Sequence, residues 1–243
     1  MIDIHCHILP AFDDGAADLQ ESLAMARAAV ASGVSTIVVT PHFSGEPASM
    51  EQLPLLISRY QQLRATLREE NIPLNLHLGA EILCRPETLR MARQKALPTL
   101  SNTNYILCEF VFSESPVFMN KILAAVAAAG YRVVIAHPER YDAVQRDLRL
   151  AEKWFLQGYV LQLNKGSVLG SFGPRVQQTA EMMLENGFAH ILASDAHSTL
   201  YRTADMGQLR SWLNTHYPPE YARILLEENP LRLLKGLDMV PAE

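Results

Sequence analysis

Seven short, almost continuously apolar runs, each followed by a segment with helical character, constrain the fold of this chain most strongly. Strands that are apolar along their whole length are typical of buried parallel sheets, whose crossovers are normally helices. Seven such units predict a closed or nearly closed β/α barrel in a single α/β domain, residues 1–243. The alternative is an open doubly wound sheet, but no G-x-G-x-x-G follows the first run. The predicted strands are residues 1–6, 35–40, 74–80, 105–108, 132–136, 159–163 and 190–193.

Capping residues and glycine stops predict the helices between these strands. Asp18 is a suitable N-cap, and Glu21 follows it by three residues, which is the spacing of a capping box. Gly33, Gly130 and Gly158 stand where predicted helices end. The predicted helices are residues 18–31, 50–70, 86–95, 117–129, 148–157, 174–186, 204–215 and 219–235.

Charge, hydropathy and cysteine usage narrow the functional classes. A formal net charge of −5 argues against a broad nucleic-acid interface. No apolar run approaches the ~20 residues that cross a bilayer, and polar residues interrupt the apolar N-terminus, so we expect neither membrane insertion nor a signal peptide. The three cysteines, Cys6, Cys84 and Cys108, lie scattered in or beside apolar runs. They fit reduced thiols in the cytoplasm better than a disulfide framework.

The first strand carries the sequence His5-Cys6-His7. Side chains alternate along a strand, so both imidazoles are expected on one face, with Ile4 and Cys6 on the other. Histidine is a common metal ligand, and two imidazoles on one rigid element make half of a metal site. Cys6 is interpreted as a small buried packing residue.

The other predicted strands also end in polar residues. In a β/α barrel the C-terminal ends of the strands converge on the face where active sites are built. Five of the eight histidines lie at these ends, which random placement explains poorly. The strand-end residues are His5, His7, His42, Glu81, Glu109, His137, Asn164, Asp195 and His197.

Imidazoles and carboxylates in this number indicate more than one metal ion. Both ligand types suit Zn²⁺, Mn²⁺ or Fe²⁺. These candidates exceed the needs of one ion and suit two or three, with Glu81 or Asp195 as a bridge. Asp14, in the loop after the first strand, is a further candidate, and the neighbouring Asp13 is its rival. Asn164 is expected to form hydrogen bonds across the barrel face rather than to bind metal.

The ordered set of motifs resembles the polymerase-and-histidinol-phosphatase (PHP) domain. More narrowly, it resembles the bacterial manganese-dependent protein tyrosine phosphatases of capsule and exopolysaccharide operons, collinearly from residue 1 to about 235. One departure is Cys6, where that family usually has serine. The matching motifs are Asp3-Ile4-His5-Cys6-His7-Ile8, Asp13-Asp14-Gly15, Thr40-Pro41-His42, Gly79-Ala80-Glu81, Glu109-Phe110, Ile135-Ala136-His137-Pro138-Glu139-Arg140-Tyr141 and Ala193-Ser194-Asp195-Ala196-His197.

The resemblance implies a distorted (β/α)7 TIM-like barrel of the PHP fold and a site for three divalent metal ions. Mn²⁺ is the implied metal, with Fe²⁺, Zn²⁺ and Mg²⁺ as alternatives. The implied partner is a cytoplasmic phosphotyrosine protein, the tyrosine-rich tail of a polysaccharide-synthesis autokinase; a homo-oligomer stays open. By position, the three ligand sets are His5, His7, Glu81 and Asp195; Glu81, Glu109 and His137; and Asp14, His42 and His197.

The expected reaction is hydrolysis of a phosphomonoester, in which a metal-bound hydroxide attacks phosphorus. Arg140 and Arg202 follow candidate ligands on loops at the same face, and the guanidinium fork matches phosphate oxygens. The family resemblance gives both arginines the phosphate-binding role, and Arg85 is a weaker candidate. His42 or His197 could supply a proton to the leaving group, and the sequence does not choose between them.

Other activities need consideration. Within the PHP group the closest alternative is a histidinol phosphatase or another small phosphomonoesterase. A metal-dependent amidohydrolase shares the first motif but usually has a carbamylated lysine where this chain has Glu109. A non-catalytic regulatory module is the third alternative. Residues 84–90 formally match the C-x5-R loop of cysteine-dependent phosphatases, but Pro86 removes an N–H, and Glu87 would repel an anion.

Overall fold

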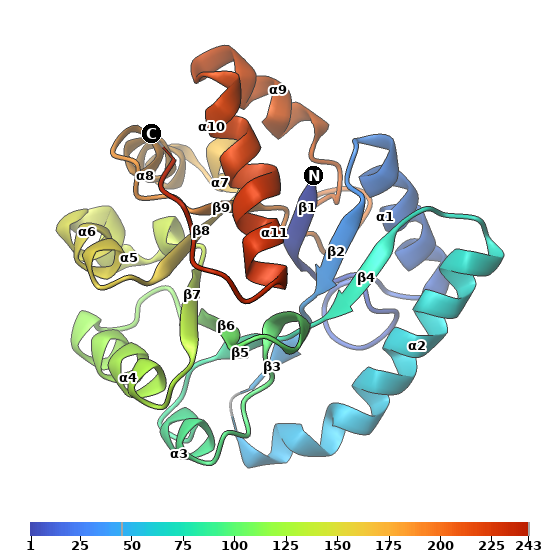
Figure 1. Cartoon of the computed structure of the whole chain (residues 1–243), viewed down its shortest axis with the longest axis horizontal. Helices are drawn as coiled ribbons and strands as arrows, with labels where there is room; N and C mark the ends of the chain where they lie inside the picture. The colour runs from blue at the N-terminus through green and yellow to red at the C-terminus, as the bar shows by residue number, and fades with distance from the viewer. Residues whose placement is uncertain (45, 243) are drawn as a thin grey trace.

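The computed structural model describes residues 1–44 and 46–242, and it has the predicted barrel architecture (Figure 1). All paired strands are parallel. Two of the seven predicted strands, 35–40 and 74–80, end early, and after Thr40-Pro41 and Gly79-Ala80 each is followed by a further short strand, so the described residues form nine strands. They are β1 (Ile2–Cys6), β2 (Thr36–Val39), β3 (His42–Phe43), β4 (Asn75–Leu78), β5 (Glu81–Leu83), β6 (Tyr105–Glu109), β7 (Arg132–Ala136), β8 (Val160–Asn164) and β9 (Ile191–Ala193).

Backbone hydrogen bonds join the two sheets, ordered β1-β2-β4 and β3-β5-β6-β7-β8-β9, into a closed barrel. On one side, Gly79 N donates to Val39 O at 2.9 Å, which carries the pairing across both interruptions. On the other side, Asp195 N donates to His5 O at 2.8 Å, and His7 N donates to Ala196 O at 2.9 Å. These contacts exclude the open doubly wound sheet. A Cβ at Gly79 would lie 2.7 Å from Leu100 Cδ2, so only glycine fits this crossing without a shift.

The predicted helices form in the expected order, with shorter or broken ends, and two short helices, Asp142–Arg146 and Lys165–Val168, were not predicted. Asp18 caps the first helix as predicted, because its side chain accepts a hydrogen bond from Glu21 N. The helix expected over 50–70 begins as a 3-10 turn (Pro47–Gln52), and the last helix contains a π turn (Ile224–Glu228). The α-helices are α1 (Leu19–Ala31), α2 (Leu53–Glu69), α3 (Thr88–Arg93), α4 (Pro116–Ala128), α5 (Asp142–Arg146), α6 (Arg149–Leu156), α7 (Lys165–Val168), α8 (Pro174–Glu185), α9 (Gly207–His216), α10 (Pro219–Arg223) and α11 (Asn229–Leu234). In the described part of the chain, every helix is too short or too polar to cross a membrane.

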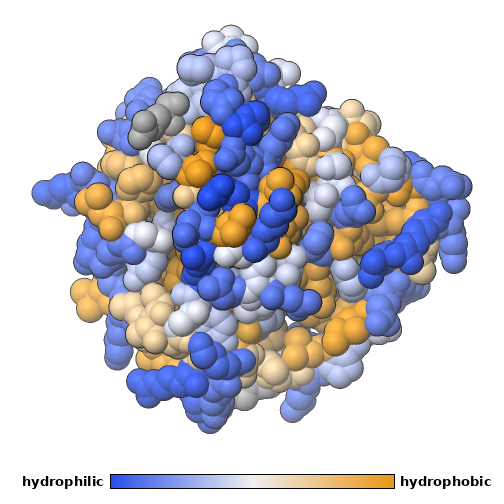
Figure 2. All heavy atoms as spheres, in the orientation of Figure 1, coloured by the Kyte–Doolittle hydropathy of each residue, from blue (hydrophilic) through white to orange (hydrophobic). Residues whose placement is uncertain are grey.

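The core has two layers. A small cluster that includes Val38, Leu107 and Val134 fills the barrel, and Leu233 of α11 packs into it. The larger cluster lies between the strands and the surrounding helices. The segment after α11 closes the end of the barrel at which the strands begin, because Tyr105 Oη donates a hydrogen bond to Leu237 O. Helix α11 crosses the centre of the view in Figure 1. On this face, hydrophilic side chains line the rim and apolar atoms form separate patches (Figure 2).

The prediction that Ile4 and Cys6 lie on the same face of β1 was wrong. Ile4 packs inside the barrel with Val38 and Leu107 instead of facing the helices. The register of β1 against β2 shifts between Asp3 and Cys6, because the three residue steps from Asp3 to Cys6 lie opposite only two steps on β2. Such a bulge re-aims the side chains that follow it. Cys6 lies in the outer cluster, as predicted.

His190 gives a stability prediction that is separate from the strand-end residues. Its Nδ1 accepts a hydrogen bond from Leu161 N, and burial lowers its pKa from 6.5 to about 4. Between pH 6.5 and 4 the unfolded chain binds a proton there that the folded protein does not. The free energy of unfolding should therefore decrease as the pH is lowered from 6.5 to 4, by at most about 3 kcal/mol.

Urea unfolding of wild type and His190→Asn across this range measures the effect, because asparagine keeps an acceptor but does not titrate. The variant should lose less stability than wild type on acidification. Parallel pH profiles for the two proteins would contradict the prediction.

Candidate metal centre

All nine predicted metal ligands lie together where the strands end. Three groups have ligand atoms within 4.8 Å of one another. We call them the inner group (His5, His7, Glu81, Asp195), the loop group (His7, Asp14, His42, His197) and the edge group (His42, Glu81, Glu109). Each pair of groups shares one residue, so the three positions adjoin. His137, the ninth residue, has Nε2 3.0 Å from Glu81 Oε1 and 3.6 Å from Glu109 Oε1.

The inner group is fully buried and holds its ligand atoms face to face. His5 Nε2 lies 3.2 Å from His7 Nε2, so both imidazoles point the same way, as predicted. Asp195 Oδ1 lies 3.4 Å from His5 Nε2 and 3.5 Å from His7 Nε2. The carboxylate of Glu81 contacts His5, His7, His42 and His137, at 3.0 to 3.3 Å. Glu81 is therefore the centre of the cluster.

The histidine rings are held by their other nitrogen atoms. His5 Nδ1 lies 2.9 Å from Gln162 Oε1, and His7 Nδ1 lies 2.8 Å from Asp13 Oδ2. His197 Nδ1 lies 3.1 Å from the backbone oxygen of Asp195. An acceptor at Nδ1 fixes the proton there and leaves the Nε2 lone pair free. All three rings thus present Nε2 to the cluster.

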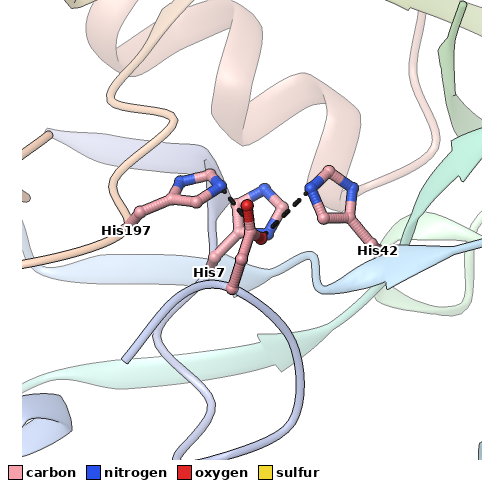
Figure 3. Close-up of side chains that lie close together, drawn as sticks. His7, His42 and His197 are labelled. Carbon is pink, nitrogen blue, oxygen red and sulfur yellow. Dashed lines mark ion pairs between the residues drawn. The ribbon is translucent and has the colours of Figure 1, made fainter. Parts of the chain in front are cut away.

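The two neighbouring aspartates have different surroundings. Asp14 Oδ1 lies 3.3 Å from His42 Nε2 and 3.4 Å from His197 Nε2, which places its carboxylate between the two rings. Figure 3 shows the rings of His42 and His197 on either side of His7. Asp13 instead accepts hydrogen bonds from Gly15 N and His42 N while it contacts His7 Nδ1. Asp13 therefore orients the loop and His7, and Asp14 faces the open side of the loop group.

Negative charge is in excess within the cluster. Burial would lower the pKa of both inner histidines, but Glu81 chiefly raises that of His5 to about 9. Asp13 and Glu81 raise the pKa of His7 to about 10. Burial and the charge of Glu81 raise the pKa of Glu109 to about 7. Without a cation, His5, His7 and Glu109 therefore retain protons that a divalent ion would displace.

Unpaired polar atoms test whether the residues fit a metal. Among the described residues, Asp195 Oδ1 and His197 Nε2 are buried without a hydrogen-bond partner. Burial, with the charges of His7 and Arg202, lowers the pKa of His197 to about 4, so its ring is neutral at neutral pH. A buried carboxylate oxygen and a buried imidazole lone pair without partners are costly unless a cation binds them. This donor set fits divalent metal ions that accept N and O ligands.

Backbone strain occurs at two of these residues. His137 has φ +35° and Asp195 has φ +50°, in the left-handed region that side chains with a Cβ seldom adopt. His137 follows β7 directly, and Asp195 follows β9 after one residue, Ser194. The unusual φ values turn the two side chains toward the cluster, and such strain is typical of functional sites.

Both predicted phosphate-binding arginines reach the inner group. Arg140 Nη1 lies 3.5 Å from Asp195 Oδ2, and Arg202 forms an ion pair with the same oxygen. Arg202 Nε also donates to Asp195 O at 3.0 Å. The weaker candidate, Arg85, is half exposed and pairs with Glu46 at 3.4 Å.

A hydrogen-bonded chain on β8 contains a residue that the sequence analysis missed. Gln162 contacts His5 Nδ1 through Oε1 and donates through Nε2 to Asn164 Oδ1 at 2.8 Å. Asn164 Nδ2 then donates to Asp195 Oδ2 at 2.6 Å, which confirms its predicted hydrogen-bonding role. The available signal was alternation, because Gln162 stands two residues before Asn164 in an otherwise apolar strand.

Asp3 is a second supporting residue, and it braces the barrel closure. Its side chain accepts from Ser194 N at 3.0 Å and from Ser194 Oγ at 2.5 Å. This pair ties β1 to the residue that precedes Asp195.

The C-x5-R match at residues 84–90 does not form a phosphate loop. Cys84 is buried, and burial with the adjacent Cys108 raises its pKa well above the ordinary value, so the thiol stays protonated. Thr88–Arg93 forms α3, and Arg90 N donates to Glu87 O within the turn. Because the thiolate is the nucleophile in thiol catalysis, this segment is unsuited to it.

Comparison with known proteins places this arrangement in a family. The family model described as capsular polysaccharide synthesis, CpsB/CapC, matches residues 1–235. The chain belongs to the CpsB/CapC family. The tyrosine-protein phosphatase YwqE of Bacillus subtilis is 35% identical over 238 residues, which cover 96% of this chain and 91% of that protein. CpsB of Streptococcus pneumoniae, named a tyrosine-protein phosphatase, is 30% identical over 241 residues, covering 96% and 98%.

Solved structures agree with this membership. A crystal structure from the pair YwqE of Bacillus subtilis and CpsB of Streptococcus pneumoniae, described as metal-dependent tyrosine phosphatases, superposes with a TM-score of 0.87 at 34% identity. The superposition covers 99% of this chain and 97% of that one. An organophosphorus hydrolase from Deinococcus radiodurans, at TM-score 0.58 and 16% identity, shares the fold alone. CpsB/CapC membership therefore rests on both sequence and structure.

Proposed function

We propose that this protein is a metal-dependent protein-tyrosine phosphatase, a phosphoric monoester hydrolase that dephosphorylates a tyrosine autokinase of capsular or extracellular polysaccharide synthesis. The observation that carries the proposal is three adjoining ligand groups beside two arginines. The relatives named tyrosine-protein phosphatases support the choice of substrate.

The ligand groups suggest which residues would hold each ion. We assign one ion to the inner group, one to the loop group and one to the edge group. For the inner ion, the family resemblance implied the same four residues. For the ion beside Glu81 and Glu109 it implied His137, whereas the edge group contains His42. His137 stays a candidate ligand, since its Nε2 contacts Glu81 and lies near Glu109.

Bound divalent ions would supply Lewis acidity toward phosphate oxygens and lower the pKa of a water molecule. The arginines would do the rest of the phosphate binding. Arg140 and Arg202 donate to Asp195 in this structure. Their N–H groups can exchange this carboxylate for the phosphate oxygens, on which negative charge develops during phosphoryl transfer. Each arginine thereby orients the phosphoryl group against the cluster.

We propose no separate acid residue. His197 is neutral at neutral pH because burial and nearby charges lower its pKa to about 4, and its one proton is held on Nδ1 by the backbone oxygen of Asp195, so its Nε2 has no proton to donate. His42 belongs to two ligand groups, and ligation would occupy its nitrogen. A tyrosyl oxygen leaves as a phenolate, whose conjugate acid has a pKa of about 10, so protonation is less necessary than for an alkoxide.

The finer assignments extend the proposal. Mn²⁺ is the proposed metal, and the tyrosine-rich tail of the autokinase is the proposed partner. The cytoplasm is the proposed location, which the free and buried thiols of Cys6, Cys84 and Cys108 support.

A turnover assay of the purified protein tests this function. With Mn²⁺, a phosphotyrosine peptide should be hydrolysed much faster than histidinol phosphate. A chelator should abolish the activity, Mn²⁺ should restore it, and a thiol-blocking reagent should have no effect. Faster turnover of histidinol phosphate would favour the other PHP activity, and activity that survives metal removal would refute the proposal.

A further inference from the structure

Arg140 lies between two aromatic rings. Its Cζ is 4.3 Å from the centre of the Phe112 ring and 4.4 Å from the centre of the Phe172 ring. The three side chains come from separate segments: the turn after β7, the loop after β6 and the loop after α7. The rings of Phe112 and Phe172 therefore both lie within cation–π distance of the guanidinium.

These two rings enclose much of the guanidinium. Arg140 is 16% exposed, and its Nη1 points its donor toward Asp195 Oδ2. An arginine without such neighbours samples many rotamers and loses this freedom when it binds an anion. Stacking between aromatic rings is favourable for a guanidinium and pre-organises its donors.

The position of Phe172 depends on a second residue. A Cβ on Gly166 would lie 2.8 Å from Phe172 Cε2 and 3.1 Å from Phe172 Cζ. Gly166 lies within α7 and is not among the glycines with positive φ. Glycine is therefore needed here because a larger side chain would clash with the Phe172 ring, and not because the backbone has a positive φ. The Phe172 ring also lines a cavity of about 440 Å³ that reaches Arg202.

We propose that Phe172, seated by Gly166 and opposed by Phe112, is a positioning residue that holds the Arg140 fork for phosphate. This inference rests on the proposed function, in which Arg140 binds the phosphoryl group. Phe172 is the cleaner probe of the two rings. The Phe112 ring also lies 5.9 Å from the ring of His137, so its removal could disturb a candidate metal ligand.

Calorimetric titration of inorganic phosphate into Mn²⁺-loaded protein tests the proposal without relying on turnover. Phe172→Leu should weaken phosphate binding by about threefold to thirtyfold, the range expected for loss of a cation–π contact. Gly166→Ala should weaken binding in the same direction, because its Cβ would displace the Phe172 ring without removing it. The metal content of both variants should equal that of wild type.

A double-mutant cycle separates positioning from a general structural effect. In an Arg140→Lys background, Phe172→Leu should cause little further loss, because the group that it positions is gone. Phe155→Leu, which removes a ring that packs on Phe188 and His190 away from the cluster, is the matched control and should bind phosphate normally.

The outcomes distinguish the two proposals. If Arg140→Lys binds and hydrolyses phosphoesters as wild type does, the phosphate-binding role of Arg140 in the proposed function fails, and the positioning role fails with it. If Arg140→Lys is impaired but Phe172→Leu behaves like Phe155→Leu, the positioning role alone is wrong. An equal loss from Phe172→Leu in both backgrounds would also overturn it.

Discussion

Glu81→Gln is expected to reduce hydrolysis of a phosphotyrosine peptide at least about a hundredfold and to lower the metal content of the protein. Glu81 belongs to two ligand groups and contacts four histidines, so one neutral amide weakens more than one metal position. Burial would raise the pKa of the Glu81 carboxyl, but the charge of His5 and hydrogen bonds from His137 and His42 lower it well below its usual range. A permanent carboxylate is therefore available for ligation at neutral pH.

Turnover and elemental analysis of the purified variant measure this effect together. Glu87→Gln is the matched control, because Glu87 is exposed, lies six residues later and makes no capping hydrogen bond with its side chain. Circular dichroism should show that both variants are folded. Wild-type metal content and turnover in Glu81→Gln would remove the central ligand from the proposed site.

Arg140→Ala and Arg202→Ala should each lower kcat/KM for an aryl phosphate by about a hundredfold, the usual loss for one donor to a developing oxyanion. Both guanidinium groups contact Asp195 Oδ2, so they lie where a phosphate beside the inner group would meet them. The effect should come from lost phosphate binding and not from lost metal, because neither arginine is a ligand.

Steady-state kinetics and metal analysis of each variant decide this point. Arg85→Ala is the control, since Arg85 pairs with Glu46 near the same face and should change kcat/KM little. If Arg140→Ala and Arg202→Ala both keep full kcat/KM, phosphate is bound by other residues. If their metal content falls in proportion to activity, the arginines support the cluster rather than the substrate.

Sequence patterns predicted the barrel because each strand is a short apolar run with its own stop signal. Interruptions in two strands were harder to foresee. At Thr40-Pro41 and Gly79-Ala80 the pairing passes from one sheet to the other, and this depends on close packing such as that of Gly79 against Leu100. The bulge that turned Ile4 into the barrel likewise reflects the register of β1 on β2, which no local pattern encodes.

The sequence by itself determined which residues stand at the ends of the strands, and therefore the composition of the cluster. Parallel strands in a barrel must end on one face, so eight imidazoles and carboxylates had to gather there, and Asp14 joins them from a loop.

Only the tertiary structure decided how they are grouped and supported. Asp14 faces two histidines while Asp13 orients a third, and Gln162 holds His5. Phe172 stacks on Arg140 from a loop 32 positions away in the chain, counted from the residue numbers. These relations depend on loop paths and on side-chain directions after strained residues, and both are set by packing between segments that are distant in sequence.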